Sequence, residues 1–330
     1  MPQLRQNPIT GHWVVISPER AKRPSDFIAP APTTAPRHGG CHFCVGGAAH
    51  AERIQEYDTK STYLAPNKYP AFIADSTAAS ARSVSHDDQF YRARLATGGH
   101  DIIVINDPNV TIMNLTKQEW IDLLTTFQRR GVAYKQRDEI EVAMPIYNHK
   151  AAAGASVDHP HAQLFATSTI PNQITREVHG SFTFFERERH CVFCELILHE
   201  QKAAVRIVSE NDTFVAYTFY AARFPFEVWV LPKVHHDRFE TADSAVISGL
   251  ATFLPTIFHR YDQVLHDPAL NFWIHSLPNS LDQADFYHWH LEIAPRLTTY
   301  GGFELGSGVI IDMVSPERAA LILRADPPTY

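Results

Sequence analysis

One order of motifs occurs twice along this chain of 330 residues, and this repetition constrains the fold more than any other feature. Each copy begins with a CxxC pair, continues with a strand-like apolar run and an amphipathic helical stretch, and closes with an HxH motif. Three kinds of landmark in one order favour two copies of one unit over two unrelated motifs. The first copy comprises CHFC (41–44), DIIVIND (101–107), residues 117–135 and HPHAQ (159–163), and the second comprises CVFC (191–194), EVWVLPK (227–233), residues 245–265 and HWHLE (288–292).

The segment STIPNQITREVHGSF leaves the first closing motif and places the boundary between the copies. We expect a first unit at residues 1–175 and a second at 176–330. Each unit reads as strands, a helix and a further strand, which favours an α+β class with antiparallel sheets and helices packed on them. The second helix is expected to be interrupted at Pro255. In the superposition, Val104 falls on Val230, Ile105 on Leu231, Asn109 on His235, His159 on His288, His161 on His290 and Gln163 on Glu292.

Composition argues against several classes of function. The net charge is −7 and no run of Lys or Arg could neutralise several phosphates of a polymer, so nucleic-acid binding is not expected. The N-terminus lacks the apolar core of a signal peptide, and no stretch approaches about 18 consecutive apolar residues, so neither export nor membrane spanning is expected. We expect a cytoplasmic protein, in which two CxxC pairs indicate metal or redox chemistry before disulfides.

The second copy supplies a complete set of zinc ligands. A structural zinc site combines four thiolate or imidazole ligands, commonly a CxxC turn closed by residues from elsewhere in the chain. The alternative is two buried thiols with unrelated histidines nearby. The set is Cys191, Cys194, His235 and His288, which we favour over a competing group of Glu177, His275 and His290 with His288, because cysteines hold zinc more tightly than a carboxylate does.

The first copy supplies an incomplete set. Its cysteines and first histidine match, but an asparagine stands where the second copy has its strand-following histidine, and asparagine is a poor zinc ligand. A thioredoxin-like use of either CxxC is disfavoured, because neither opens a helix after a strand. The set is Cys41, Cys44 and His159, with His42, His100, water or Asn109 completing the shell, or with no metal at all; we expect one or two zinc ions per chain.

The closing motif of the first copy places a histidine where it can act as a nucleophile. In a strand, His159, His161 and Gln163 project from one face at steps of roughly 7 Å. If His159 binds metal, His161 is left to attack phosphorus, and Gln163 can donate to a phosphate oxygen without adding charge. The alternative is that His161 is a buried, hydrogen-bonded core histidine with no part in catalysis. In the second copy, Glu292 stands where the first copy has Gln163, so we expect the second copy to be structural.

A loop of small residues, YNHKAAAGAS (147–156), comes just before this motif. Such loops let a phosphate approach backbone N–H groups closely. The signal is weak alone, and its position before HPHAQ strengthens it.

These residues resemble the galactose-1-phosphate uridylyltransferase family, a branch of the histidine triad superfamily built from two such units. The likeness covers nearly the whole chain: LRQNPITGHWVVISPERAKRP (4–24) resembles the N-terminal signature, CHFC the zinc knuckle, HPHAQ the active-site strand and GGFELGSGVIID (301–312) the C-terminal segment. The resemblance implies two tandem histidine-triad-like units, a homodimer, and ping-pong transfer of UMP from a UDP-hexose to a hexose 1-phosphate. The site residues that it implies are His161 as the nucleophile, Gln163 and Ser156 on the phosphoryl oxygens, Asn148 and Asn67 in the nucleotide pocket, and Phe303 and Glu304 on the sugar phosphate.

Two departures from the family pattern widen the choice of reaction. Asn109 stands where many members place a histidine, and no lysine closely follows PRLTTY. The second CxxC and GGFELGSG resemble the ADP-glucose phosphorylase-like branch, in which inorganic phosphate accepts the nucleotide. The alternatives are therefore an NDP-glucose or dinucleoside polyphosphate phosphorylase, a non-catalytic zinc-binding module, and a metallohydrolase that uses His159 and His161.

Overall fold

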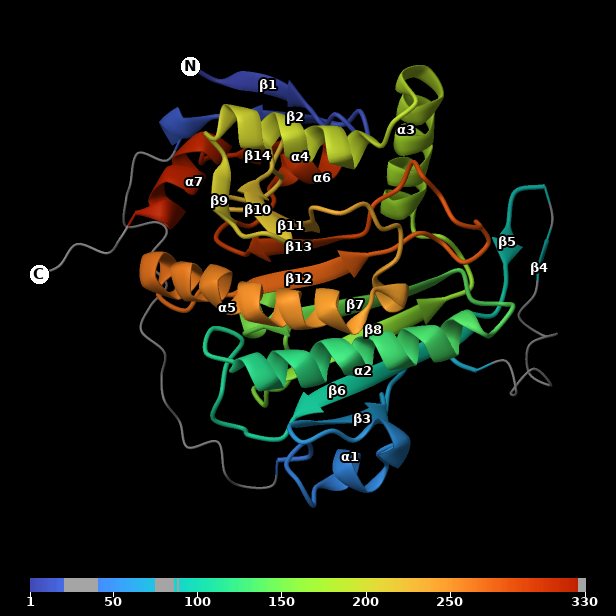
Figure 1. Ribbon diagram of the computed structural model, residues 1–330. Helices are drawn as coiled ribbons and strands as arrows, with labels where there is room; N and C mark the ends of the chain where they lie inside the picture. Colours follow the sequence, from blue (N-terminus) through green and yellow to red (C-terminus); the bar gives the residue numbers. More distant parts are fainter. Residues whose placement is uncertain (21–40, 75–85, 88, 326–330) are drawn as a thin grey trace, which may run out of the picture.

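The computed structural model describes residues 1–20, 41–74, 86–87 and 89–325 (Figure 1). Residues 21–24 of the N-terminal signature lie outside these ranges. No helix in the described part of the chain combines the length and apolar character needed to cross a membrane.

A nine-stranded sheet forms the centre of the molecule, and all its neighbouring strands are antiparallel. The first predicted unit supplies the four strands from β3 to β7 in this order, and the second supplies the five from β12 to β9. The two sets of strands join where β7 pairs with β12. This arrangement confirms the α+β class with two tandem units. The order across the sheet is β3 (Thr62–Pro66), β6 (Gly98–Ile105), β8 (His161–Thr167), β7 (Val142–His149), β12 (Leu270–His275), β13 (His290–Pro295), β11 (Val228–Pro232), β10 (Phe214–Thr218) and β9 (Ile207–Glu210).

Smaller elements surround this sheet. A three-stranded sheet of β1, β2 and β14 brings the two ends of the described chain together, and it contains one parallel pair, β2 with β14. The inferred unit boundary at residues 175 and 176 falls within α3. The bounds are β1 (Gln3–Gln6), β2 (Trp13–Ile16), β14 (Ile310–Asp312), β4 (His86–Asp87), β5 (Arg92–Ala93), α1 (Ala48–Ala51), α3 (Asn172–Glu188), α4 (Val192–Ala203), α6 (Gly302–Ser307) and α7 (Pro316–Arg324).

Two long helices, α2 (Lys117–Lys135) and α5 (Ser244–Leu265), lie side by side on one face of the sheet (Figure 1). The start of α2 is fixed by a capping box: the Thr116 hydroxyl accepts from the Glu119 N–H, and the Glu119 carboxylate accepts from the Thr116 N–H. Asp243 caps α5 by accepting from the Val246 N–H.

The expected interruption at Pro255 is wrong, because α5 continues through the proline. Proline removes one helical hydrogen bond and disturbs the turn before it. The neighbouring side chains Leu254, Ile257 and Phe258 are all buried against the sheet, and this burial keeps the helix continuous.

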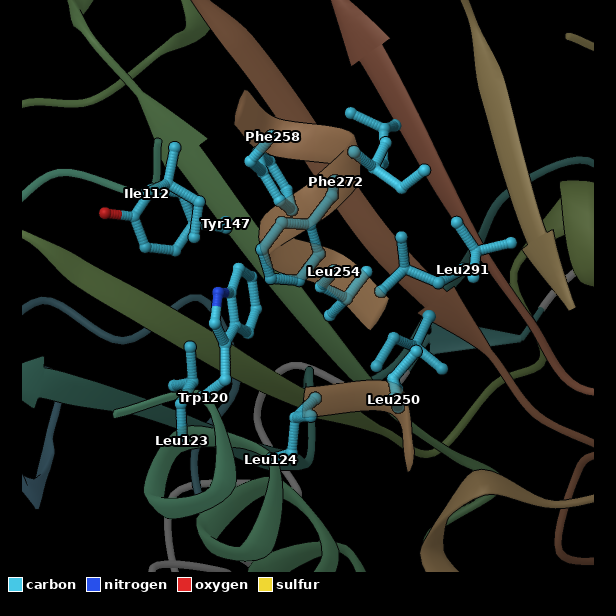
Figure 2. Packing of buried hydrophobic residues seen from close by; sticks show 14 of the residues in the cluster. Ile112, Trp120, Leu123, Leu124, Tyr147, Leu250, Leu254, Phe258, Phe272 and Leu291 are labelled. Atoms are coloured by element: carbon cyan, nitrogen blue, oxygen red, sulfur yellow. The ribbon is translucent and has the colours of Figure 1, made fainter. Parts of the chain in front are cut away.

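The core between the helices and the sheet is shared by both units (Figure 2). Trp120 of α2 stacks on Phe258 of α5 at 5.2 Å between ring centroids, and Tyr147 of β7 stacks on Phe272 of β12 at 5.5 Å. Contacts between the units therefore occur both within the sheet and between the helices that cover it.

The strand pairing corrects the superposition of the two copies by one residue. Val104 of β6 lies opposite His161, whereas Val230 of β11 lies opposite Leu291, the residue after His290. Val230 belongs to the core under the helices, whereas Val104 packs on the other face of the sheet. Because strand side chains alternate between faces, the true match for Val104 is the residue after Val230.

Candidate active site and metal clusters

His161 begins β8 with its ring almost fully buried, 6% exposed. Its Nδ1 lies 2.8 Å from the backbone carbonyl oxygen of His159. A carbonyl can only accept, so Nδ1 carries the proton and Nε2 keeps its lone pair. Burial lowers the pKa of His161, and the neighbouring His159 lowers it further, against the raising effect of the carbonyl bond. The arrangement favours a neutral imidazole with Nε2 as its nucleophilic atom.

Gln163 is held by His100, which the sequence suggested only as a possible metal ligand. His100 accepts from the Ala71 N–H at Nδ1 (3.2 Å), so its Nε2 carries the proton and donates to Oε1 of Gln163 (2.8 Å). Burial lowers the pKa of His100, which favours this neutral form. The ring stacks on Phe165 at 3.9 Å, and the amide nitrogen of Asn67 lies 3.1 Å from Nε2. With its oxygen occupied, Gln163 is left with its amide nitrogen as a donor.

The loop between β7 and β8, residues 150–160, borders a small hollow of about 50 Å³ that is open to solvent. Two of its residues have positive φ: Gly154 at 89° and Lys150 at 68°, which is uncommon for a side chain other than glycine. Ser156 is exposed in this loop, and Asn148 ends the preceding strand. The lining residues are Val110, Thr111, Tyr147, Asn148, His149, Lys150, Ala155, Val157, Asp158, His159, Pro160 and His161.

The first cysteine pair meets His159. Nδ1 of His159 lies 3.4 Å from Sγ of Cys41 and 3.7 Å from Sγ of Cys44. Its Nε2 lies 2.7 Å from the Ile105 carbonyl oxygen and therefore donates to it, which turns the Nδ1 lone pair toward the sulfurs. Among the described residues, these three side chains supply three of the four ligands of a thiolate and imidazole metal site.

His42 and His100 are not part of this cluster, and Asn109 as its fourth ligand stays a prediction. Asn109 is exposed, and its side chain donates to Asp107 at 3.0 Å. His42 is exposed, and His100 is bound to Gln163. The match of Asn109 with His235 depended on the superposition that the strand register corrects.

The second cysteine pair gathers all four expected ligands, whose donor atoms lie within 4.8 Å of one another. Sγ of Cys194 is 3.4 Å from Nδ1 of His235 and 3.6 Å from Nδ1 of His288. The hydrogen bond from the Cys191 thiol, followed by those from His235 and His288, lowers the pKa of Cys194 to about 3 against the opposing effect of burial. Two thiols with two imidazoles are the donor set of a closed tetrahedral zinc site.

In the second unit, a buried charge network occupies the positions of the active motif. Glu292 lies opposite Trp229 and Trp273, as Gln163 lies opposite Ile102 and Ile146. This register matches His290 with His161. Two residues before Trp229 and Ile102, it also matches Glu227 with His100. Two residues after Trp273 and Ile146, it matches His275 with Asn148.

In this second copy, buried ionisable side chains occupy the positions that match His161 and Gln163. His290 is fully buried, with its ring 4.6 Å from that of Trp229. The Arg223 guanidinium pairs with Glu292 and, at 3.2 Å, with Glu227. Nδ1 of His275 lies 3.0 Å from the Glu177 carboxylate. Glu177, His275, His290 and Glu292 could together hold a cation, but His288 lies with the cysteines and not in this group.

Phe303 and Glu304 are not among the residues that line the hollow. They lie on α6, which packs against β14 of the small sheet. Phe303 is 55% exposed, and the Glu304 carboxylate accepts from the Gly301 N–H at 2.9 Å.

Asn271 and Asp267, two residues of the second unit that contact the active-site loop, were not expected there. Asn271 donates to Asn148, and Asp267 pairs with His149 and Lys150. Their proximity depends on the pairing of β7 with β12, for which the sequence carries no signal that we identified.

Comparisons with known proteins identify the family. The family model for the galactose-1-phosphate uridyl transferase N-terminal domain matches residues 1–171, and that for the C-terminal domain matches residues 177–315. The ADP-glucose phosphorylase of Arabidopsis thaliana is 31% identical over 333 residues, which cover 98% of this chain and 92% of that protein. The galactose-1-phosphate uridylyltransferase of Thermotoga maritima is 27% identical, with 98% of each chain covered. A crystal structure of an Arabidopsis thaliana ADP-glucose phosphorylase with bound ADP-glucose superposes with a TM-score of 0.83 at 28% identity, over 99% of each chain. The chain therefore belongs to the galactose-1-phosphate uridylyltransferase family.

Proposed function

We propose that this protein transfers a nucleoside monophosphate from an NDP-hexose to an acceptor through a covalent nucleotidyl-His161 intermediate. The observation that carries the proposal is the hydrogen bond from Nδ1 of His161 to the His159 carbonyl, which leaves Nε2 as the nucleophilic atom beside the loop hollow. A nucleophile activated in this way divides one difficult transfer into two easier steps.

In the first step, Nε2 of His161 attacks the α-phosphorus, a P–N bond forms, and the P–O bond to hexose 1-phosphate breaks. The nucleotidyl-imidazole carries a positive charge, which the His159 carbonyl stabilises through the Nδ1 proton. Gln163 donates its amide N–H to a non-bridging oxygen on which charge develops. In the second step, an acceptor oxygen attacks the same phosphorus, and the P–N bond breaks.

We propose ADP-glucose as donor and inorganic phosphate as acceptor, which reverses our order of preference from the sequence. The support is the ADP-glucose phosphorylase relative at 31% identity and the related structure with bound ADP-glucose. The second candidate is transfer of UMP from a UDP-hexose to a hexose 1-phosphate, favoured by the galactose-1-phosphate uridylyltransferase relative at 27% identity.

Intact-mass measurement without acceptor tests the intermediate and identifies the base. Mixed separately with ADP-glucose and UDP-glucose, the protein should gain one nucleoside monophosphate, and His161→Ala should gain none. Adding phosphate or galactose 1-phosphate to the isolated adduct then identifies the acceptor from the nucleotide released. A non-catalytic zinc-binding module predicts no adduct with any donor, and a metallohydrolase predicts turnover without an adduct.

The metal clusters are proposed to be structural zinc sites. Cys191, Cys194, His235 and His288 would hold one ion, and Cys41, Cys44 and His159 a second with a non-protein ligand. Such an ion supplies cross-linking of distant segments and takes no part in the transfer.

We also propose that the protein is a homodimer and that Phe303 and Glu304 contact the sugar phosphate in the partner's site. The support for both proposals is that Phe303 and Glu304 lie on α6 and are not among the residues that line the hollow of their own chain. Size-exclusion chromatography with light scattering tests the dimer. Mixing His161→Ala chains with Phe303→Ala chains tests the shared site, because restored turnover requires one subunit to complete the other.

A further inference from the structure

We propose that the second unit positions the loop of the first unit that precedes His161, residues 150–160, through Asn271 and Asp267. The inference rests on the proposed nucleotidyl transfer and assigns a role in it to residues outside the reacting groups.

Asn271 of β12 bonds to both sides of the start of the loop. Its amide nitrogen donates to Oδ1 of Asn148 (2.7 Å) and to the carbonyl oxygen of Ala153 (2.7 Å). The guanidinium of Arg296 donates to Oδ1 of Asn271 at 3.4 Å, and a guanidinium has no acceptor, so the orientation of this amide is fixed. Asn148 is thereby left with its amide nitrogen as a donor.

Asp267 holds the next two residues. Its carboxylate lies 2.6 Å from Nε2 of His149 and 2.7 Å from Nζ of Lys150, and its backbone carbonyl also accepts from Nζ. Lys150 has φ 68° and ψ 161°, which an L residue rarely adopts, and Asp267 itself has φ 55°. A backbone conformation of this kind persists where surrounding contacts determine it.

The positions of these contacts point to alignment of the reacting groups. They hold residues 148, 149, 150 and 153, and the loop then leads directly to His161. Nucleophilic attack depends on alignment within fractions of an ångström. The second unit therefore acts on the first across the β7–β12 junction.

The test compares two isosteric changes at opposite ends of β7. Asn271→Asp removes the donations to Asn148 at the end of β7 and to the Ala153 carbonyl in the loop. Asn279→Asp is the matched control: its amide nitrogen also crosses between the units, donating to the Ile140 carbonyl at 2.9 Å before β7 begins. We expect Asn271→Asp to slow single-turnover formation of the adduct about 10- to 100-fold at saturating donor, and Asn279→Asp to leave that rate unchanged although it weakens the fold.

Asp267 gives an independent comparison. Asp267→Ala should slow adduct formation, and Asp267→Asn, which keeps an acceptor for His149 and Lys150, should restore part of the rate. Hydrogen exchange of the amides in residues 150–157 should accelerate in Asn271→Asp and Asp267→Ala but not in Asn279→Asp.

The outcomes separate this inference from the proposed function. If the wild type forms an adduct and Asn271→Asp matches the control in rate and exchange, loop positioning is overturned. If the wild type forms no adduct, the proposed function fails, and hydrogen exchange still decides whether the second unit orders the loop.

Discussion

At the scale of single residues, the site depends on hydrogen bonds that occupy one end of each functional side chain. The His159 carbonyl holds Nδ1 of His161, and His100 holds the oxygen of Gln163. Each bond leaves one defined atom of the side chain unused: a lone pair on His161, which lines the hollow, and a donor on Gln163. Preorganised groups of this kind need no rearrangement as charge develops.

The bond between His100 and Gln163 predicts strong coupling between these two residues. Gln163→Ala should lower kcat about 100-fold, because it removes a donor to the developing charge. His100→Leu should lower kcat about 10-fold by releasing the orientation of the amide. The double variant should match Gln163→Ala, since the histidine acts through the glutamine.

Steady-state kinetics of the three variants measures this cycle. Thermal unfolding should show all three folded at the assay temperature. Additive losses in the double variant would mean that His100 acts on the reaction by another route.

The sequence alone is enough to single out the motif of the first copy, because its candidate residues lie within five consecutive positions. The spacing of HPHAQ is enough to select His161 as the candidate nucleophile and Gln163 as its partner. His100 could not be assigned its role, because its contact with Gln163 depends on how β6 pairs with β8. The match of Val104 with Val230 was one residue out of register, and a slip of one residue moves a strand side chain to the other face.

At the scale of elements, the ends of the helices follow local chemistry, whereas their continuity follows burial. Residues 117–135 were predicted to be helical and form α2, whose capping box is readable as Thr116 to Glu119. Pro255 was predicted to interrupt the second helix, but α5 runs past it. Local propensity is a weak signal where a helix buries a continuous apolar face.

Pro255 therefore leaves α5 less stable than a helix with the same packing and an uninterrupted series of backbone hydrogen bonds. Pro255→Ala restores a backbone donor and removes the clash with the preceding turn, so it should raise the free energy of unfolding by up to about 3 kcal/mol. Chemical denaturation at equilibrium measures the change. Thr256→Ala, at the exposed position next to the proline, is the control for helix propensity alone. A destabilised Pro255→Ala variant would mean that the proline ring makes packing contacts of greater value than the lost hydrogen bond.

At the scale of the whole molecule, the two units carry different side chains at matching positions. The first keeps a hollow beside a histidine whose proton is fixed, and the second fills the matching positions with Arg223 and its carboxylate partners. A continuous sheet and a shared core join them, so the second unit can hold the first rigidly.

The two cysteine clusters should therefore respond differently to loss of a ligand. Cys194→Ser breaks the four-ligand cluster of the second unit and should lower the free energy of unfolding by about 4 kcal/mol or more with loss of one metal ion per chain. Its rate of adduct formation at low temperature should remain near that of the wild type, because His161 lies in the other unit. Cys44→Ser should slow adduct formation, since the first cluster orients His159, whose carbonyl holds the His161 proton. Metal content by mass spectrometry, thermal unfolding and single-turnover mass measurement check the three parts. Equal loss of rate in both variants would show that the clusters support the site only through global stability.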